Sequence, residues 1–100
     1  DTYGVYNDSV LSPPPIMSEV TVVATGGSGN DYGAFNTSAT AVFRNSAVIG
    51  ETFSINHSSG PVVLVADTLL GGPVSGAASF NCVGAYTELF VALDTDCTPI

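Results

Sequence analysis

Basic side chains are almost absent from this chain of 100 residues. It has no lysine and one arginine, Arg44, against nine carboxylates, and its formal net charge is -8. Proteins hold nucleic acids and anionic membrane surfaces mainly through lysine and arginine. The composition therefore excludes nucleic acid as a partner and gives no basis for contact with an anionic membrane.

Long apolar runs are also missing, and none approaches the roughly 20 residues of a membrane-spanning helix. We therefore expect no membrane insertion. Apolar residues still make up 45 % of the chain and charged residues only 10 %. This composition predicts an ordered chain despite eleven glycines and six prolines. The length predicts a single domain with one core.

The usual groups of enzyme active sites are scarce. His57 is the only histidine, which excludes zinc sites built from several histidines and leaves a hydrolase triad without a second indication. The nearest approach to G-x-S-x-G has Pro73 where the motif requires glycine. The carboxylates are scattered and form no evident acid–base pair. We expect neither an enzyme nor a bound cofactor.

Two stretches bear a partial likeness to metal sites. Residues 26–33 match the calcium-binding nonapeptide G-G-x-G-x-D-x-U-x except at Gly33, but that motif works in tandem copies. The same stretch is not a dinucleotide loop, because Tyr32 stands where G-x-G-x-x-G needs its last glycine. Asp94 and Asp96 supply two carboxylates where a hard cation takes six or more oxygen ligands. We expect a loop and a solvated turn, with no metal.

Two cysteines, Cys82 and Cys97, suit one disulfide and hence an oxidising compartment. A bridge within the chain would close a ring of about 16 residues and contribute roughly 3 kcal/mol. A bridge between subunits is the alternative. Candidate N-glycosylation sites are present at Asn7, Asn36 and Asn56. With a start at Asp1 that suits a processed chain, these features predict a secreted, extracellular, acidic protein and a candidate glycoprotein.

Hydrophobic patterning predicts an all-β fold. The apolar run of residues 62–66 follows Gly60 and Pro61 and is typical of a strand buried on both faces. Residues 86–93 alternate as a second strong strand, and no internal repeat is evident. Turn signals about every ten residues predict an antiparallel β-sandwich or jelly-roll-like barrel of seven to eight short strands. The predicted core consists of Phe53, Ile55, Val63, Leu64, Val65, Leu89 and Val91.

Three consecutive prolines, Pro13 to Pro15, favour a stiff extended spacer because proline cannot donate to a sheet. They predict an extended N-terminal segment, residues 1–15, ahead of a β-sandwich domain, residues 16–100. One interpretation is a terminus lying on the surface. The other is an assembly strand that pairs with a neighbouring subunit, with its apolar residues at Tyr3, Val5, Val10 and Leu11.

Three classes of function agree with these features. The first is a structural or assembly subunit of a filament, pilus or coat, which self-associates by N-terminal strand exchange; low charge limits repulsion between stacked copies. The second is a binding module for carbohydrate or protein that uses exposed Tyr3, Tyr6, Tyr32 or Tyr86. The third is a secreted effector, toxin or inhibitor. We expect the first.

Overall fold

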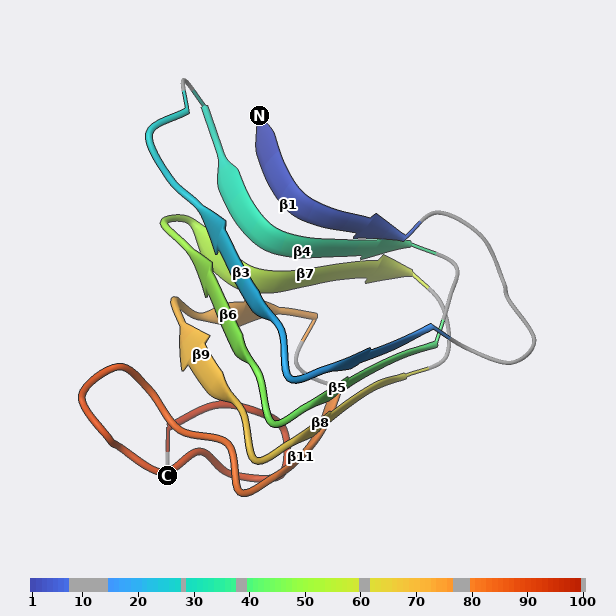
Figure 1. The fold of residues 1–100 in the computed structure, drawn as a ribbon, viewed down its shortest axis with the longest axis vertical. Coiled ribbons are helices and arrows are strands. Elements are labelled where there is room, and N and C mark those ends of the chain that lie inside the picture. Colours follow the sequence, from blue (N-terminus) through green and yellow to red (C-terminus); the bar gives the residue numbers. More distant parts are fainter. Residues whose placement is uncertain (8–14, 28, 38–39, 60–61, 77–79, 100) are drawn as a thin grey trace.

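The chain winds as a coil in which each of the first three turns, or rungs, adds one strand to each of three sheets, and the fourth rung adds one strand to two of them (Figure 1). The computed structural model describes residues 1–7, 15–27, 29–37, 40–59, 62–76 and 80–99. Within these ranges all paired strands run parallel to one another. The all-β prediction is confirmed, but the antiparallel sandwich is wrong.

The three sheets differ in strand length and in order. Sheet A has the longest strands and the order β1 (Thr2–Asn7), β4 (Asp31–Thr37), β7 (Phe53–Ser59) and β10 (Val74–Ser75). Sheet B consists of β2 (Ile16–Ser18), β5 (Ala41–Arg44), β8 (Val63–Ala66) and β11 (Phe80–Val83). Sheet C consists of β3 (Thr21–Ala24), β6 (Ala47–Gly50) and β9 (Leu69–Gly71). The described residues contain no helix that could cross a membrane.

Inward side chains of successive rungs lie above one another, because parallel strands in register place equivalent residues side by side. The core is built from such stacks, including Val22, Val48 and Leu70, and also Phe43, Val65 and Cys82. Ile55, Val63 and Val65 are buried, as the sequence predicts.

Four predicted core residues lie elsewhere. Leu64 is 37 % exposed, because sheet B is covered on one face only and its strands alternate in and out. Phe53 is half-buried on the outer side of sheet A. Leu89 and Val91 are exposed because residues 86–93 form no strand; Tyr86 makes only isolated bridges there.

The corner between sheets B and C has one conformation in every rung. Its first residue has a positive φ, which favours glycine or asparagine over other residues. The four equivalent residues are Glu19 (56°), Asn45 (47°), Asp67 (47°) and Gly84 (70°). The repeated corner shows that the coil is an internal structural repeat, which the sequence analysis did not detect.

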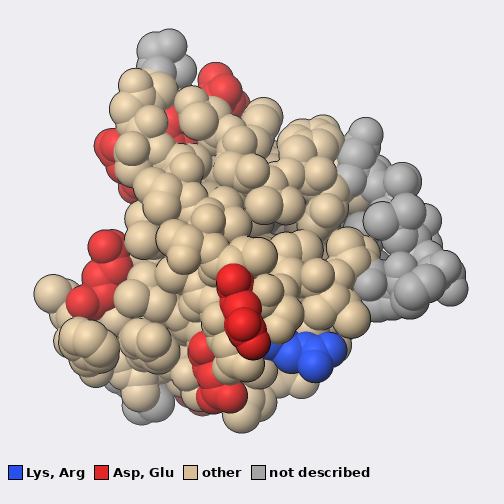
Figure 2. All heavy atoms as spheres, viewed as in Figure 1, with Lys and Arg blue, Asp and Glu red and all other residues tan. Residues whose placement is uncertain are grey.

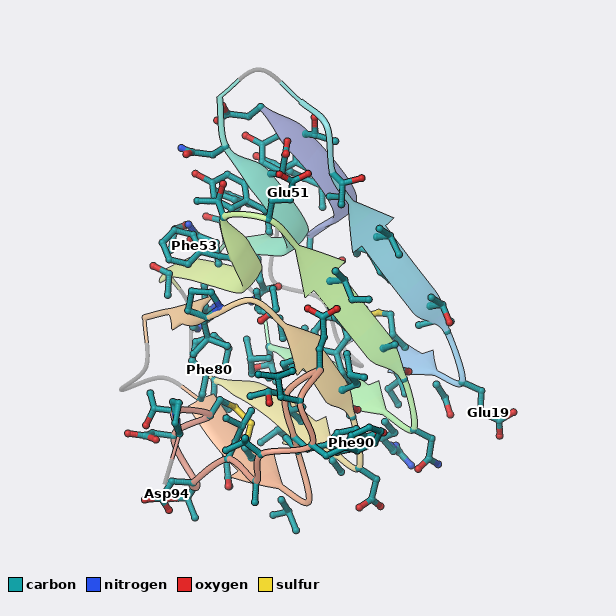
Figure 3. The ribbon with its side chains drawn as sticks, turned by 90° about the vertical axis from the view of Figure 1, so that its left-hand side faces the viewer. Glu19, Glu51, Phe53, Phe80, Phe90 and Asp94 are labelled. Atoms are coloured by element: carbon teal, nitrogen blue, oxygen red, sulfur yellow. A yellow bond between two sulfur atoms is a disulfide. The ribbon has the colours of Figure 1, made fainter. Side chains whose placement is uncertain are left out.

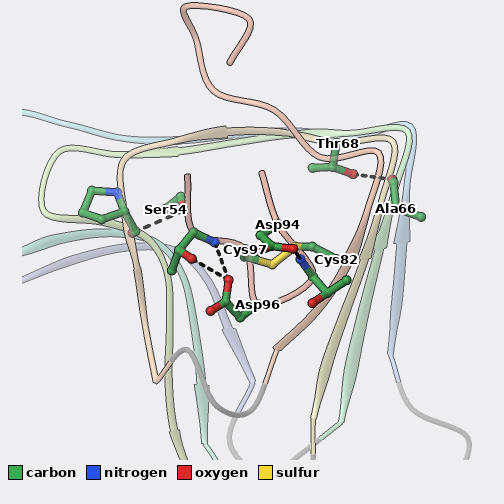
Figure 4. Close-up of a disulfide and its surroundings, with 10 residues drawn as sticks. Ser54, Ala66, Thr68, Cys82, Asp94, Asp96 and Cys97 are labelled. Atoms are coloured by element: carbon green, nitrogen blue, oxygen red, sulfur yellow. Dashed lines mark hydrogen bonds between the residues drawn. A yellow bond between two sulfur atoms is a disulfide. The ribbon is translucent and has the colours of Figure 1, made fainter. Parts of the chain in front are cut away.

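The C-terminal segment closes one end of the coil. The backbone N–H of Cys82 donates to the carbonyl of Thr95 (2.8 Å) and that of Leu93 to the carbonyl of Ala85 (3.0 Å), so this segment pairs with the outer side of β11 and of the corner that follows it. A disulfide joins Cys82 to Cys97 within the chain, with Cα atoms 5.3 Å apart (Figure 4). It fastens this closing segment to the last strand of sheet B.

Candidate functional site

The long strands of sheet A are bent, and the bend gathers aromatic rings on the outer face (Figure 1). In a straight strand, residues three apart point to opposite faces. Yet the ring centroids of Tyr3 and Tyr6 are 5.3 Å apart, and those of Tyr32 and Phe35 are 5.6 Å apart. The bend between them therefore brings both rings of each strand to one side.

Glycine makes this bend possible. An added Cβ at Gly33 would lie 2.6 Å from the carbonyl oxygen of Ser54 and 2.9 Å from Cγ1 of Val48. Gly4 occupies the equivalent place in β1, where a Cβ would meet Val22 and lie 2.7 Å from the carbonyl oxygen of Gly33. The backbone of successive rungs can approach this closely only without side chains.

We call the resulting cluster of five rings the aromatic face. Two files of stacked rings run along the coil axis: Tyr3 on Tyr32 (5.5 Å) and Tyr32 on Phe53 (5.9 Å) in one, and Tyr6 on Phe35 (5.2 Å) in the other. Interplanar angles of 13°, 5° and 7° mean that the stacked rings are nearly parallel. Figure 3 shows Phe53 at the end of the longer file. The rings of the first rung, Tyr3 and Tyr6, are the most exposed of the five.

The N-terminal end of the coil presents strand edges. β1 is the last strand of sheet A at this end, and β2 and β3 are the last strands of sheets B and C. Among the described residues, no strand pairs with their outer edges. The first rung also carries four of the nine large apolar residues that are exposed, with exposed fractions of 40–54 %: Tyr3, Tyr6, Ile16 and Val23. This rung is the candidate site.

Charged residues are sparse around the first rung. Arg44, the only basic residue, is exposed at the corner after β5, and carboxylates are dispersed over the face in Figure 2. At the tip of the coil, Asp1 accepts a hydrogen bond from the backbone N–H of Asn30 (3.2 Å). The side chain of Asn30 donates to the hydroxyl of Tyr32 (2.9 Å) and forms a polar rim on the aromatic face.

The single histidine lies inside the coil. His57 is buried in a polar file with Asn36 and Asn7, one residue from each rung of sheet A. Its Nδ1 atom lies 2.9 Å from Nδ2 of Asn36, and its ring packs edge-on against Phe80. With 4 % of its surface exposed, His57 offers no surface for a substrate.

The two stretches with a partial metal likeness use their carboxylates internally. The backbone N–H groups of Gly26 and Gly27 donate to Glu51 (2.8 Å) and Asp31 (3.2 Å), so these carboxylates hold the loop. Within the described residues, no group of three or more His, Cys, Asp or Glu side chains could hold a metal ion.

The pair Asp94 and Asp96 forms a turn. The carboxylate of Asp94 accepts from the backbone N–H of Thr95 (2.8 Å). Asp96 accepts from the hydroxyl of Thr98 and from its backbone N–H (3.1 Å). These two hydrogen bonds, the hydroxyl first, hold the pKa of Asp96 below its ordinary value because they favour the ionised form.

The three glycosylation motifs lie in different surroundings. Asn36 is fully buried, and the Nδ2 atom of Asn7, the atom that would carry a glycan, is buried as well. Asn56 is half-buried beside Phe35 on the outer face of sheet A. In the folded chain, Asn56 is therefore the candidate glycosylation site that remains, and its use stays a prediction.

The residues of the predicted assembly strand are partly placed. Tyr3 and Val5 lie in β1, opposite Tyr32 and Ala34 of the same chain. Val10 and Leu11 lie outside the described residues. Tyr86 is at the opposite end of the coil, where it stacks on Phe90. The structure thus brings Tyr3, Tyr6 and Tyr32 together and leaves Tyr86 apart.

The sequence analysis missed Phe35 and assigned Phe53 to the core. The signal that could have found them is a short repeat, Tyr3-Gly4-Val5-Tyr6-Asn7, which recurs as Tyr32-Gly33-Ala34-Phe35-Asn36. No family model, curated protein or solved structure matches the chain.

Proposed function

We propose that the protein is an extracellular structural subunit that associates with other copies through the N-terminal end of its coil. The observation that carries this proposal is the first rung, where three strand edges without a partner among the described residues coincide with four exposed apolar side chains. Unpaired edges are a template for pairing with another chain, and exposed apolar patches of this kind favour interfaces.

The size of the end suits such a contact. The molecule measures 34 × 32 × 24 Å, so one end of the coil offers an area of the order of the 800 Å² per partner found in stable interfaces. The aromatic files strengthen the contact, because Tyr3 and Tyr6 each use one ring face within the chain. Their opposite faces are directed out of the first rung and can stack on rings of a partner.

The partner end that fits is another first rung, because at the opposite end the C-terminal segment pairs with β11 and sheet A ends in the two-residue β10. Two identical ends meet about a two-fold axis, and their β1 strands then run antiparallel. Placing Tyr3 opposite Tyr6 of the second copy, and the reverse, puts aromatic rings opposite one another on one face. The Tyr3–Tyr6 spacing makes this pattern self-complementary.

Strand exchange uses the same residues differently. In the chain described here, β1 pairs with β4 over residues 2–7, so exchange requires β1 to leave its own sheet and join that of a neighbour. Edge pairing leaves the fold unchanged and needs no such opening. We therefore favour edge pairing as the mode of assembly.

The test is sedimentation velocity of the parent and of two matched variants. Tyr6→Asp replaces one of the two facing rings by a carboxylate opposite Tyr3 of the second copy and is expected to lower the particle mass; where this is the single contact between copies, the mass falls by about a factor of two. Val83→Asp, on the exposed outer face of sheet B, is the control and is expected to leave the mass unchanged. A parent that is monomeric at high concentration, or equal masses for the parent and Tyr6→Asp, contradicts the proposal.

A binding module for carbohydrate is the second candidate, and the gathering of five rings favours it. The stacking weakens it, because a sugar stacks on the flat face of a ring and Tyr32 already uses both of its faces within the chain. Titration with cellohexaose, followed by tyrosine fluorescence, tests it directly. Saturable binding that is lost in Tyr3→Ala but kept in Tyr86→Ala supports this function over assembly.

A further inference from the structure

The C-terminal end of the coil carries a rigid apolar knob. Residues 87–91 form a tight turn held by Thr87, whose backbone N–H donates to the carbonyl of Val91 (2.9 Å) and whose carbonyl accepts from Phe90 (2.9 Å). The hydroxyl oxygen of Thr87 accepts from the N–H groups of Leu89 and Val91, both at 3.2 Å. These four hydrogen bonds fix the turn, so its side chains are ordered before any partner arrives.

We define the knob as Leu89, Phe90 and Val91. The folding of the chain alone does not explain its composition. Leu89 and Phe90 are 84 % and 83 % exposed. Phe90 also has a φ of 59°, a conformation that costs a residue other than glycine about 1–2 kcal/mol. Strained backbone and exposed apolar side chains at one place are typical of binding surfaces. In Figure 3, Phe90 lies on the side of the C-terminal segment that faces the viewer.

A groove of about 510 Å³ adjoins the knob. Its walls are mainly apolar, and two knob residues, Leu89 and Val91, form part of them. Glu88 is the one charged residue of the lining, and its carboxylate lies over Gly71, with Oε1 2.8 Å from the position of an added Cβ there. The groove is therefore suited to an apolar side chain such as Phe90.

We propose that this knob and groove form a second self-association surface, in which Phe90 of each copy enters the groove of the other. A two-fold contact requires one patch that is complementary to itself, and a knob whose flanks are the walls of its own groove meets this requirement. Charge allows a second copy at this groove, because its lining carries one carboxylate, Glu88, in a chain whose net charge of -8 otherwise repels its copies.

The consequence for assembly rests on the proposed function. A two-fold contact at each end of the coil joins copies alternately head to head and tail to tail, and because the two axes lie at opposite ends of the coil the row of copies stays open. The product is an open filament. With the knob contact alone, the protein forms dimers.

The test uses Phe90→Gly, because glycine accepts the positive φ and this relief offsets the loss of the stacking of Phe90 on Tyr86. It is compared with the parent, with Tyr6→Asp and with the double variant by sedimentation velocity over a range of concentrations. The expected masses are a distribution above the dimer for the parent, dimers for each single variant and monomers for the double variant. Phe90→Tyr keeps the ring and the strain, and is expected to behave as the parent.

The two proposals fail in different ways. The knob contact is overturned if Tyr6→Asp remains monomeric at the highest concentration. It is also overturned if Tyr6→Asp forms an oligomer that persists when Phe90→Gly is added. If Phe90→Gly alone yields monomers, the knob contact stands and the N-terminal contact fails. Flotation of Tyr6→Asp with phosphatidylcholine vesicles is run in parallel. If the protein stays monomeric in solution but binds the vesicles in a way that depends on Phe90, a lipid surface is the occupant of the knob. That result overturns the self-association surface.

Discussion

The side-chain nitrogen of Asn36 lies 2.9 Å from Nδ1 of His57, inside the coil and one rung apart. An amide nitrogen donates and does not accept, so Nδ1 of His57 is the acceptor in this contact. This pair orients the ring of the only histidine. It also ties β4 to β7 through side chains, in addition to the backbone ladder.

Removal of one partner is expected to be costly. Asn36→Leu leaves Nδ1 of His57 buried without its donor, and the free energy of unfolding is expected to fall by about 1–3 kcal/mol. The double variant Asn36→Leu with His57→Phe removes both polar groups and is expected to recover part of this loss. Urea unfolding measures all three proteins, with His57→Phe completing the cycle. Effects that simply add would show that the two side chains are not coupled.

The sequence predicts strands well and their arrangement poorly. Strand signals are local, and Ile55, Val63 and Val65 are buried as their apolar character predicts. The choice between a sandwich and a coil depends on which strands pair, and that information lies in the repeat. Equivalent residues are 29 positions apart from Tyr3 to Tyr32 but 21 from Tyr32 to Phe53. Unequal loops therefore conceal the period.

The candidate site was predictable only in part. Tyr3 and Val5 stand out as apolar residues ahead of the prolines, and they do lie in the outermost strand of sheet A. The packing of Tyr3 into one cluster with Phe35 and Phe53 depends on the register between strands and on the glycine bend. Neither can be inferred from one strand at a time. The knob was missed because Leu89 and Val91 fit the alternation of a buried strand. Their exposure follows from the turn at Thr87.

The difference between an inward residue of sheet A and an outward residue of sheet B gives a stability test of the coil. Ile55→Ala empties a fully buried site and is expected to lower the free energy of unfolding by about 2–5 kcal/mol. Leu64→Ala changes a side chain on the outer face and is expected to cost clearly less than that range. Thermal and urea unfolding of both variants give the comparison. An equal loss for the two would place Leu64 in the core and favour the strand buried on both faces.

The turn at Asp96 predicts a pH dependence. The pKa of this carboxyl is lower in the folded chain than in the unfolded one, so its ionised form stabilises the fold above the ordinary aspartate pKa. That contribution is lost as the pH falls through the lowered value. A carboxyl-detected NMR titration should show Asp96 titrating below the ordinary range. In Thr98→Ala, which removes the hydroxyl donor but keeps the backbone N–H, the pKa should rise. An unchanged pKa would show that the hydroxyl does not hold the carboxylate.

The repeated corner allows the fold to be stabilised by design. Glu19, Asn45, Asp67 and Gly84 share one backbone conformation, and glutamate suits it least, because a short amide side chain tolerates positive φ better. Glu19→Asn is therefore expected to raise the free energy of unfolding by up to about 1 kcal/mol. Asn45→Val, which puts a β-branched residue at the same place in the next rung, is expected to lower it by more than that.

Urea unfolding of these two variants is compared with Thr21→Asn, an exposed position in the strand β3, where asparagine disfavours the strand. We expect asparagine to raise the free energy of unfolding at position 19 and to lower it at position 21. Opposite effects at the two positions would show that the corner conformation, and not asparagine as such, is responsible. If Glu19→Asn and Thr21→Asn change stability alike, the two positions do not differ in backbone conformation. The corner of the first rung then departs from those of the later rungs, and the regular coil does not extend to the end that carries β1.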